Sequence, residues 1–172
     1  MPLCDVQLII VRHAIAYERD ALRWPDDRDR PLTPDGEAKF RRAARGIGRV
    51  SGSIDTVLCS PLVRAWRTAE ILTDEAGWPE PLVFESLEPE RSAADVAAAL
   101  MPHRMRDTVA LVGHEPLLGE LVSFLLTGSD SGSAFPLKKG AVAAVDVDGD
   151  IPNGSSLRYL LTPKIERAIK SS

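Results

Sequence analysis

The side chains in this sequence that are best suited to chemistry follow short apolar runs. Arg12 and His13 come directly after one run, His114 follows a second run by two residues, and Arg64 follows a third by five. An imidazole can act as a nucleophile or move a proton, and a guanidinium is suited to bidentate recognition of phosphate. One histidine at the end of a strand is most often an ordinary loop residue. Two histidines and two arginines in equivalent places, however, predict a shared site.

This set of residues predicts a pocket for a dianionic phosphoryl group. Phosphoryl transfer depends mainly on positioning and on neutralising the charge of the phosphoryl oxygens. Neighbouring guanidinium groups lower the pKa of a histidine and keep it neutral, so that an imidazole here could attack phosphorus. The sequence Ser60-Pro61 is typical of a helix start, which would add free backbone N–H groups and the positive end of the helix dipole. Such a site needs no metal.

Two other chemistries can be weighed on the same residues. Cys59 and Arg64 are similar to the pair in the loop of cysteine-dependent phosphatases, but that loop has five residues between them. Here there are four, and none is glycine. A metal site would combine His13 and His114 with the aspartates of residues 26–29, but no pair of ligands has a recognisable spacing. We therefore expect neither cysteine catalysis nor a bound metal.

Apolar runs suited to buried strands alternate with segments of helical spacing. Thr33-Pro34, like Ser60-Pro61, combines an N-cap residue with a proline at the first helical position, and Asp95 can complete a capping interaction with Ser92. We expect strands at residues 8–11, 56–59, 82–84, 108–112, 141–147 and 157–161. Helices are expected to begin at Thr33-Pro34 and at Ser60-Pro61, the second running to about Ala76, and to cover residues 92–100 and 116–126.

The alternation predicts an α/β fold, a three-layer sandwich with a mostly parallel central sheet flanked by helices and a hairpin of the last two strands. We interpret residues 1–172 as a single domain. Ligands of open α/β sheets bind beyond the carboxyl ends of the strands, so this fold would bring the two histidines and the two arginines together. The segment from Glu18 to Arg30 is dense in charge and is either a lid or a solvated loop.

Composition excludes several classes of function. The chain of 172 residues is 44% hydrophobic and 27% charged, which predicts an ordinary globular protein. Its formal net charge of −4 argues against a general binder of nucleic acid or of anionic membranes. No apolar run approaches the length that spans a bilayer, and the first residues lack the pattern of a secretion signal. Cys4 and Cys59 form no CxxC motif, so we expect a reducing, cytoplasmic setting.

Five segments follow one another along the chain: LIIVRHA at residues 8–14, RPLTPDG at 30–36, SPLVRA at 60–65 followed by TAE at 68–70, VGHEP at 112–116 and LKKG at 137–140. Together they resemble the histidine phosphatase superfamily, the group with the phosphoglycerate-mutase-like fold. The two that include residues 30–36 and 137–140 are similar to its SixA-type branch, the phosphohistidine phosphatases. The resemblance runs from about Leu8 to Leu161.

The resemblance implies a role for each candidate residue. His13 would be the nucleophile and would be phosphorylated transiently, while Arg12 and Arg64 would hold the phosphoryl oxygens. His114 would complete the pocket and stabilise the transition state. Arg30 would be a further phosphate contact from the loop, the alternative being a surface ion pair with a neighbouring aspartate, Asp27 or Asp29. No cofactor and no metal are implied.

The sequence departs from the family pattern in two places. Ala14 replaces a glycine, which matters only if the backbone there needs a positive φ. No proton donor stands at a motif that can be matched, and the acidic candidates are Glu85, Glu88 and Asp27. A phosphohistidine substrate departs as an imidazole, which is a good leaving group when protonated and has less need of a strong general acid. The missing motif therefore favours a substrate with a nitrogen–phosphorus bond.

Three functions remain to be compared. The first is a metal-independent phosphatase that acts on phosphohistidine in a phosphorylated protein, with no nucleic-acid or membrane partner. The second is a phosphatase of small phosphate monoesters on the same residues. The third is a catalytically silent phosphate-binding or interaction module. The joint presence of Arg12, His13, Arg64 and His114 argues against the third.

Overall fold

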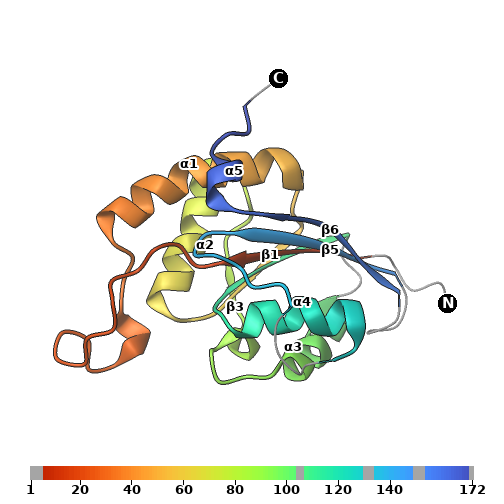
Figure 1. Cartoon of the computed structure of the whole chain (residues 1–172), viewed down its shortest axis with the longest axis horizontal. Coiled ribbons are helices and arrows are strands. Elements are labelled where there is room, and N and C mark those ends of the chain that lie inside the picture. Colours follow the sequence, from red (N-terminus) through yellow and green to blue (C-terminus); the bar gives the residue numbers. More distant parts are fainter. Residues whose placement is uncertain (1–5, 104–106, 130–133, 149–153, 171–172) are drawn as a thin grey trace.

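The computed structural model describes residues 6–103, 107–129, 134–148 and 154–170. Its centre is one six-stranded sheet with helices on both faces, as Figure 1 shows, which confirms the predicted α/β sandwich. Along the sheet the order of the strands is β3-β2-β4-β1-β5-β6. The strands are β1 (Val6–Arg12), β2 (Thr56–Cys59), β3 (Leu82–Val83), β4 (Thr108–Gly113), β5 (Val142–Val147) and β6 (Ser155–Leu161).

The pairing is mostly parallel, as predicted. Strands β3, β2, β4 and β1 run in one direction, while β5 pairs antiparallel with β1, and β6 pairs antiparallel with β5. The last two strands therefore form the expected hairpin, although residues 149–153 of the predicted turn lie outside the described residues. Because β4 lies between β1 and β2, the carboxyl ends of all three strands meet at one edge of the sheet.

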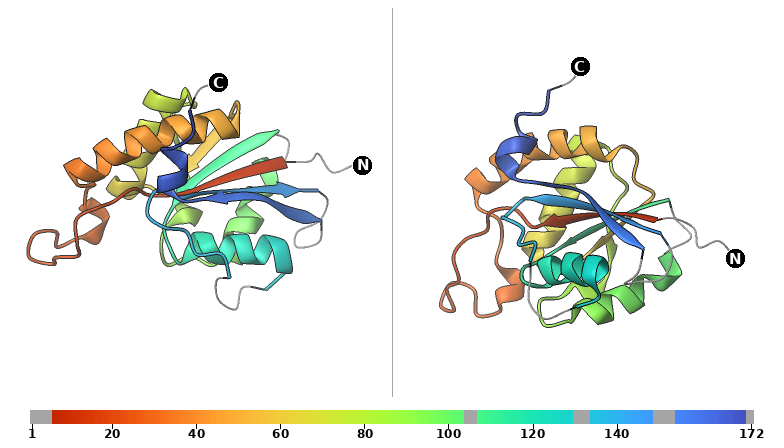
Figure 2. Two further views of the ribbon diagram at one scale, coloured as in Figure 1. Left: turned by 45° about the horizontal axis from the view of Figure 1, so that its top comes forward. Right: turned by 45° about the vertical axis from the view of Figure 1, so that its right-hand side comes forward.

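Helices cover both faces of this sheet (Figures 1 and 2). One face is covered by α1 (Pro34–Ser51), α2 (Val63–Ala76) and the short α5 (Pro163–Glu166), and the other by α3 (Ala93–Leu100) and α4 (Leu117–Thr127). Helix α5 packs so closely on α1 that a Cβ atom at Gly46 would overlap the carbonyl oxygen of Glu166. Three single turns of 3-10 helix complete the structure, η1 (Asp27–Asp29), η2 (Glu85–Leu87) and η3 (Met101–His103).

The core is divided between the two faces by the alternation of strand side chains. Ile9 and Val11 of β1 belong to the cluster under α1 and α2, whereas Leu8 and Ile10 belong to the cluster under α3 and α4. All four are nearly inaccessible to solvent. A strand buried on both faces reads as a continuous apolar run, which explains why the run before Arg12 was visible in the sequence.

Of the three helix caps predicted from the sequence, those at Thr33 and Ser92 are confirmed. The Thr33 hydroxyl accepts a hydrogen bond from the N–H of Gly36, and Ser92 and Asp95 form a capping box. The predicted start at Ser60-Pro61 is wrong, because α2 begins at Val63 with Leu62 as its N-cap. The Ser60 hydroxyl is instead hydrogen bonded to a histidine ring at the edge of the sheet. Its role is therefore in the site and not in the helix.

Residues 17–31 form a loop that projects from the sandwich beyond the carboxyl edge of the sheet, as both views in Figure 2 show. An antiparallel bridge between Ala16 and Leu32 closes the base of this loop. Within the described ranges, no helix combines the length and apolar character needed to cross a membrane.

Candidate active site

The two histidines that follow strands lie beside one another. Because Arg12 of β1 is in register with Gly113 of β4, the next residue along each strand stands at the same point of the sheet edge. The N–H of His13 donates to the carbonyl oxygen of Gly113 at 2.9 Å, and the centroids of the His13 and His114 rings are 5.2 Å apart. The parallel pairing thus brings together two residues that are 101 positions apart in the sequence.

The His13 ring has a defined tautomer. Its Nδ1 atom lies 2.7 Å from the carbonyl oxygen of Ala14, and a carbonyl oxygen can only accept, so Nδ1 carries the proton. The pKa of His13 is lowered to about 3, mainly by burial and in addition by the charges of Arg64, Arg12 and Arg30, while the hydrogen bond to Ala14 opposes this change. The ring is therefore neutral near pH 7, with the lone pair on Nε2.

His114 is buried and is held by one hydrogen bond. Its Nε2 lies 2.8 Å from the Ser60 hydroxyl oxygen, which itself accepts the N–H of Leu62 at 3.4 Å and so has its own proton to donate. The hydroxyl can either donate to this nitrogen or accept from it, and the Nδ1 atom of the ring has no hydrogen-bond partner among the described residues. The pKa of His114 is lowered to about 2, mainly by burial and in addition by the neighbouring His13 and the arginines.

Two arginines approach the histidine pair from different elements. Arg64, the second residue of α2, is 2% exposed, and Arg12 ends β1. Arg64 donates from Nη1 to the Asp27 carbonyl oxygen at 2.8 Å, and Arg12 donates from Nη1 to the Leu137 carbonyl oxygen at 2.8 Å. The Nε atoms of both guanidinium groups are buried and have no partner within the described part of the chain.

Arg30 joins this group from the projecting loop. It is only 7% exposed, its Nε donates to Asp27 Oδ1 at 2.7 Å, and its Nη1 donates to the Tyr17 carbonyl oxygen at 2.6 Å. The ion pair with Asp27 that the sequence offered as an alternative does form, and it joins a buried Arg30 side chain to a partly exposed carboxylate. The charge of Arg30 reaches both His13 and His114, since it contributes to lowering the pKa of each.

The three candidate proton donors lie in different surroundings. Asp27 contacts the arginines directly, with Oδ2 at 3.0 Å from Arg64 Nη2, and its pKa is lowered mainly by the hydrogen bond from Arg30. Glu88 pairs with Arg28 at 2.5 Å and forms no hydrogen bond with either active-site histidine in the described chain. Glu85 begins η2 and forms no hydrogen bond or ion pair with the four central residues within the described ranges. Of the three, Asp27 is thus the one that belongs to the cluster.

Three supporting residues were not singled out as site residues by the sequence. The Thr68 hydroxyl accepts the N–H of Ala14 at 3.0 Å and donates to the Arg64 carbonyl oxygen at 2.7 Å, which ties β1 to α2. Glu115 accepts the N–H of Leu137 at 2.8 Å, and so fixes the carbonyl that binds Arg12. Ser60 is the third. The only signal for Thr68 and Glu115 was their presence in the segments TAE and VGHEP.

The backbone at Ala14 resolves one departure from the family pattern. Positive φ among the described residues occurs only at glycines, so Ala14 stands in a conformation open to any residue. Gly140, with φ of 82°, donates its N–H to the carbonyl oxygens of Arg12 and His13. The position at this edge that requires a positive φ is therefore Gly140. The backbone at Ala14 has no such requirement, so an alanine can replace the glycine of the family pattern there.

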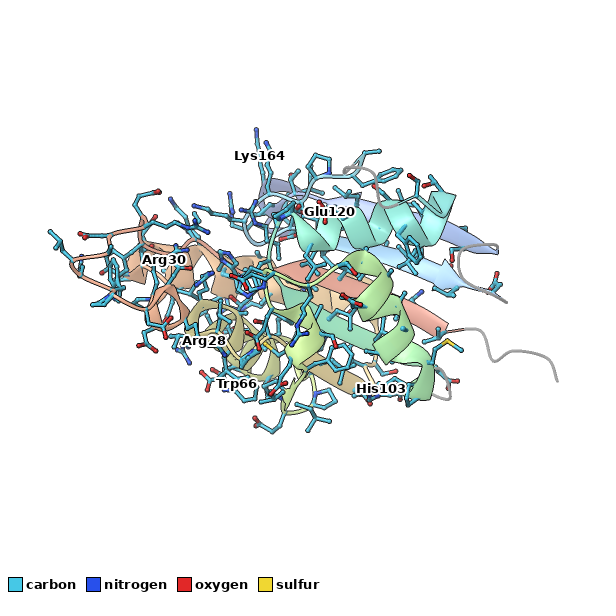
Figure 3. All side chains as sticks on the ribbon, turned by 90° about the horizontal axis from the view of Figure 1, so that it is seen from below. Arg28, Arg30, Trp66, His103, Glu120 and Lys164 are labelled. Carbon is cyan, nitrogen blue, oxygen red and sulfur yellow. The ribbon has the colours of Figure 1, made fainter. Side chains whose placement is uncertain are left out.

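The other chemistries considered from the sequence find no support in the geometry. Cys59 is fully buried and burial raises its pKa, so it remains a thiol. The third histidine, His103, lies far from Arg30, near the opposite end of the molecule in Figure 3, with its ring against Phe84. Among the described residues, no three His, Cys, Asp or Glu side chains gather as metal ligands would.

Comparison with known proteins gives a consistent result. The family model described as histidine phosphatase superfamily (branch 1) matches residues 8–91. An uncharacterised protein of Picosynechococcus is 34% identical over 139 residues, which cover 80% of this chain and 82% of that protein. The phosphohistidine phosphatase SixA of Escherichia coli is 32% identical over 126 residues, which cover 72% of this chain and 76% of SixA.

Similarity extends to the three-dimensional structure. The solved structure of the protein histidine phosphatase SixA complexed with tungstate superposes with a TM-score of 0.79 at 28% identity. The superposition covers 93% of this chain and 99% of that chain, so the two proteins share the whole sandwich and not only its central strands.

Proposed function

Because the chain belongs to the histidine phosphatase superfamily, we propose that it hydrolyses phosphohistidine in a phosphorylated protein through a phosphohistidine intermediate on His13. Membership in the family gives phosphatase or mutase-type chemistry. The similarity to SixA, whose name states its substrate, supports the narrower proposal. The single observation that carries it is the neutral His13, with Nδ1 bound to the Ala14 carbonyl and Nε2 free beside three arginines.

The first step is the transfer of the phosphoryl group to His13. Nε2 forms a bond to phosphorus while the bond from phosphorus to the substrate imidazole breaks, and the departing nitrogen keeps the electron pair. That imidazole leaves as a neutral ring when its other nitrogen carries a proton, so no strong general acid is required. In the second step water attacks phosphorus, its proton passes to solvent, and His13 Nε2 departs with the electron pair, releasing inorganic phosphate.

The surrounding donors stabilise the charge that develops on the phosphoryl oxygens. Arg12 and Arg64 each have a buried Nε–H group without a partner in the described chain. Each of these groups can donate a hydrogen bond to an equatorial oxygen of the phosphoryl group. With its ring proton on Nδ1, His114 is a third such donor, and its ring is held in place by Ser60. Three guanidinium groups near a phosphoryl dianion neutralise its negative charge, as a metal ion does in many other phosphoryl-transfer enzymes. This arrangement supports metal-independent catalysis.

Among the acidic candidates we assign Asp27 to positioning. Its lowered pKa keeps it ionised, so in the resting state it has no proton to give, but it fixes both Arg30 and Arg64. Glu88 and Glu85 remain weaker proposals for a proton donor. Glu88 is bound to Arg28, and Glu85 lies outside the cluster. Arg30 is proposed as a phosphate contact.

The test compares substrates on the purified protein in the presence of a chelator. A histidine-phosphorylated protein is expected to be turned over with a higher kcat/KM than a panel of sugar phosphates and nucleotides. A higher value for one of the small esters would favour the alternative function. Binding of phosphate or tungstate without turnover of any substrate would favour the silent module.

Trapping the intermediate tests the nucleophile directly. A reaction stopped with alkali during turnover is expected to leave acid-labile, base-stable phosphate on the wild-type chain and none on His13→Ala. The matched control is His103→Ala, which should trap phosphate as the wild type does. Activity that survives His13→Ala would overturn the assignment. We further propose a cytoplasmic, single-domain enzyme, for which the free, buried Cys59 gives support.

A further inference from the structure

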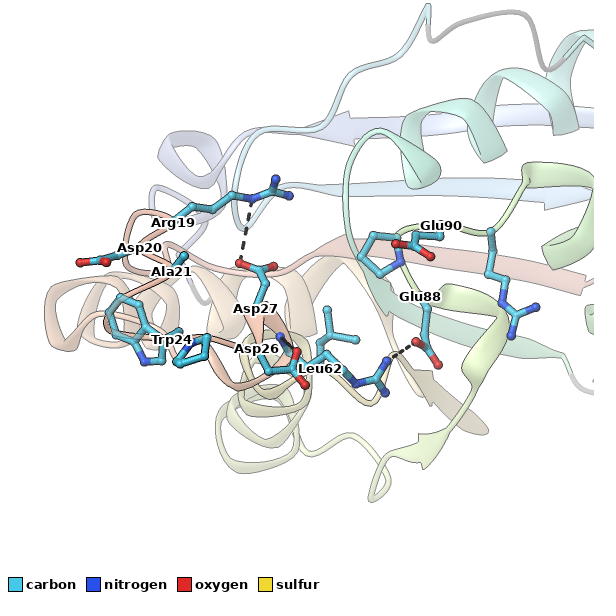
Figure 4. A pocket seen from close by; sticks show the side chains of 13 residues that line it. Arg19, Asp20, Ala21, Trp24, Asp26, Asp27, Leu62, Glu88 and Glu90 are labelled. Carbon is cyan, nitrogen blue, oxygen red and sulfur yellow. Dashed lines mark hydrogen bonds and ion pairs between the residues drawn. The ribbon is translucent and has the colours of Figure 1, made fainter.

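A cleft of about 590 Å³ opens beside the arginine cluster (Figure 4). In the close-up, Arg19, Asp20, Trp24 and Asp27 of the projecting loop stand on one side, and Glu88 and Glu90 stand on the other. The histidines do not line this space. It is therefore an additional surface next to the reacting atoms, of a size that holds a ligand.

The cleft is continuous with the phosphate site. Asp27 lines it and at the same time contacts Arg64 and Arg30. Leu62, which also lines it, is the N-cap of the helix in which Arg64 is the second residue. The molecule that carries a phosphoryl group bound by Arg64 would consequently lie beside this cleft.

The charge of the cleft is opposite to that of the phosphate site. Three lining arginines, Arg19, Arg28 and Arg91, face five lining carboxylates, which gives the lining a formal charge of −2, with Asp27 also paired to Arg30 and Arg64 behind it. A second phosphate on a small molecule would lie against these carboxylates, whereas a lysine or arginine would be attracted. The five carboxylates are Asp20, Asp26, Asp27, Glu88 and Glu90.

The loop wall is already ordered for docking. The Asp20 carboxylate accepts the N–H groups of Leu22 and Arg23 at 2.9 and 3.2 Å, and the Asp20 carbonyl oxygen accepts the N–H of Trp24 at 2.8 Å. The Arg23 guanidinium lies 4.5 Å from the ring centroids of both Tyr17 and Trp24. A preorganised surface loses little entropy when a partner binds. In the same loop the Leu22 side chain is 96% exposed.

We propose that this cleft binds a positively charged polypeptide segment next to the phosphorylated residue of the substrate protein. The proposal rests on the proposed function and adds the class of sequence that the enzyme prefers. A basic segment matches the acidic lining, and a polypeptide, unlike a compact metabolite, can contact both the cleft and Leu22. Glu90 is the residue on which to test the charge, because no hydrogen bond or ion pair joins it to the rest of the described chain.

The experiment uses two phosphohistidine peptides that differ only in their flanking residues, lysine in one and glutamate in the other. At low ionic strength we expect a kcat/KM roughly three- to tenfold higher for the lysine peptide, with the difference shrinking as salt is added. Glu90→Lys is expected to reduce or invert this ratio. Glu80→Lys, an identical change at an exposed residue outside the cleft, should keep it.

Binding separates this proposal from the proposed function. Fluorescence anisotropy with the same two peptides on His13→Gln, and on His13→Gln combined with Glu90→Lys, measures the preference without turnover. Tighter binding of the lysine peptide that Glu90→Lys removes supports the cleft, even if neither peptide is hydrolysed and the proposed function fails. Equal kcat/KM and equal affinity for the two peptides, or an unchanged ratio in Glu90→Lys, would overturn it. A preference for a bisphosphorylated small ester over both peptides would do the same.

Discussion

The Ser60 hydroxyl oxygen lies 2.8 Å from Nε2 of His114 and so connects the residues that follow two neighbouring strands, β2 and β4. This is the only hydrogen bond of the His114 ring among the described residues, because its Nδ1 has no partner. The orientation of the ring, and with it the direction in which Nδ1 points, therefore depends on a hydroxyl that takes no direct part in the proposed chemistry.

Replacing Ser60 by alanine should reduce catalysis more than stability. The Ser60→Ala variant loses one hydrogen bond, and we expect kcat on an aryl phosphate to fall roughly tenfold because His114 is no longer fixed. The control is Ser51→Ala, another buried serine, whose hydroxyl binds a backbone oxygen at the end of α1. Steady-state kinetics showing equal losses in both variants would contradict this role.

Thr68 is expected to affect stability because it satisfies a buried amide. In Thr68→Val the N–H of Ala14 loses its acceptor and the Arg64 carbonyl oxygen loses a donor. We expect the free energy of unfolding to fall by about 1–3 kcal/mol, measured by urea denaturation. Thr73→Val removes a hydroxyl that donates only to carbonyl oxygens, and it should cost less. A smaller effect at Thr68 than at Thr73 would show that the contact is dispensable.

Asp27→Asn distinguishes positioning from acid catalysis. The amide keeps the shape of the side chain but removes the charge that holds Arg30 and Arg64, so we expect a lower kcat/KM for every substrate. If Asp27 acts only by positioning, the loss is equal for an aryl ester with a good leaving group and an alkyl ester with a poor one. A much greater loss on the alkyl ester would make Asp27 a general acid. Glu88→Gln, measured on the same pair of esters, tests the other acidic candidate.

The buried histidines should make stability depend on pH. The pKa of His13 is lowered from 6.5 to about 3 in the folded chain, so between these values the unfolded chain binds a proton that the folded chain does not. The contribution of this histidine to stability is complete above pH 6.5 and is lost as the pH falls towards 3. In His13→Gln the unfolding free energy should fall less steeply with decreasing pH across the upper half of this range. The slope should decrease by the equivalent of up to one bound proton. An unchanged slope would contradict burial of a neutral ring.

Glu166 should act with the opposite sign at higher pH. It is fully buried against α1, its carboxylate oxygens accept no side-chain hydrogen bond in the described chain, and burial raises its pKa from 4.5 to about 8. The folded chain therefore retains a proton that the unfolded chain releases, and stability falls as the pH rises between these values. Thermal unfolding of Glu166→Gln should show a smaller loss of Tm from pH 5 to pH 8. Exposed Glu80→Gln is the control, and identical slopes in wild type and Glu166→Gln would contradict the expectation.

The sequence was sufficient where local pattern and topology agree. Apolar runs located the strands, and the rule that ligands bind beyond parallel strand ends was enough to predict that His13 and His114 lie together. The role of Ser60 could not be predicted in this way. A serine followed by proline before an apolar helix looks the same whether its hydroxyl caps that helix or meets an imidazole from another strand. Which of these two contacts the hydroxyl forms depends on the position of β4 beside β2 in the sheet. That position is a feature of the tertiary structure and is not visible in the local sequence.

The placement of β4 between β1 and β2 also has a consequence for how the protein folds. The first two strands are consecutive in the chain but cannot stay neighbours, since the strand that separates them is synthesised some fifty residues after β2. Closing such long loops is slow, and contacts of high sequence separation form late. A nascent chain that has not yet exposed β4 has His13 but not His114, the second histidine of the site. Activity should thus appear in a single late event, with no partly active precursor on the ribosome.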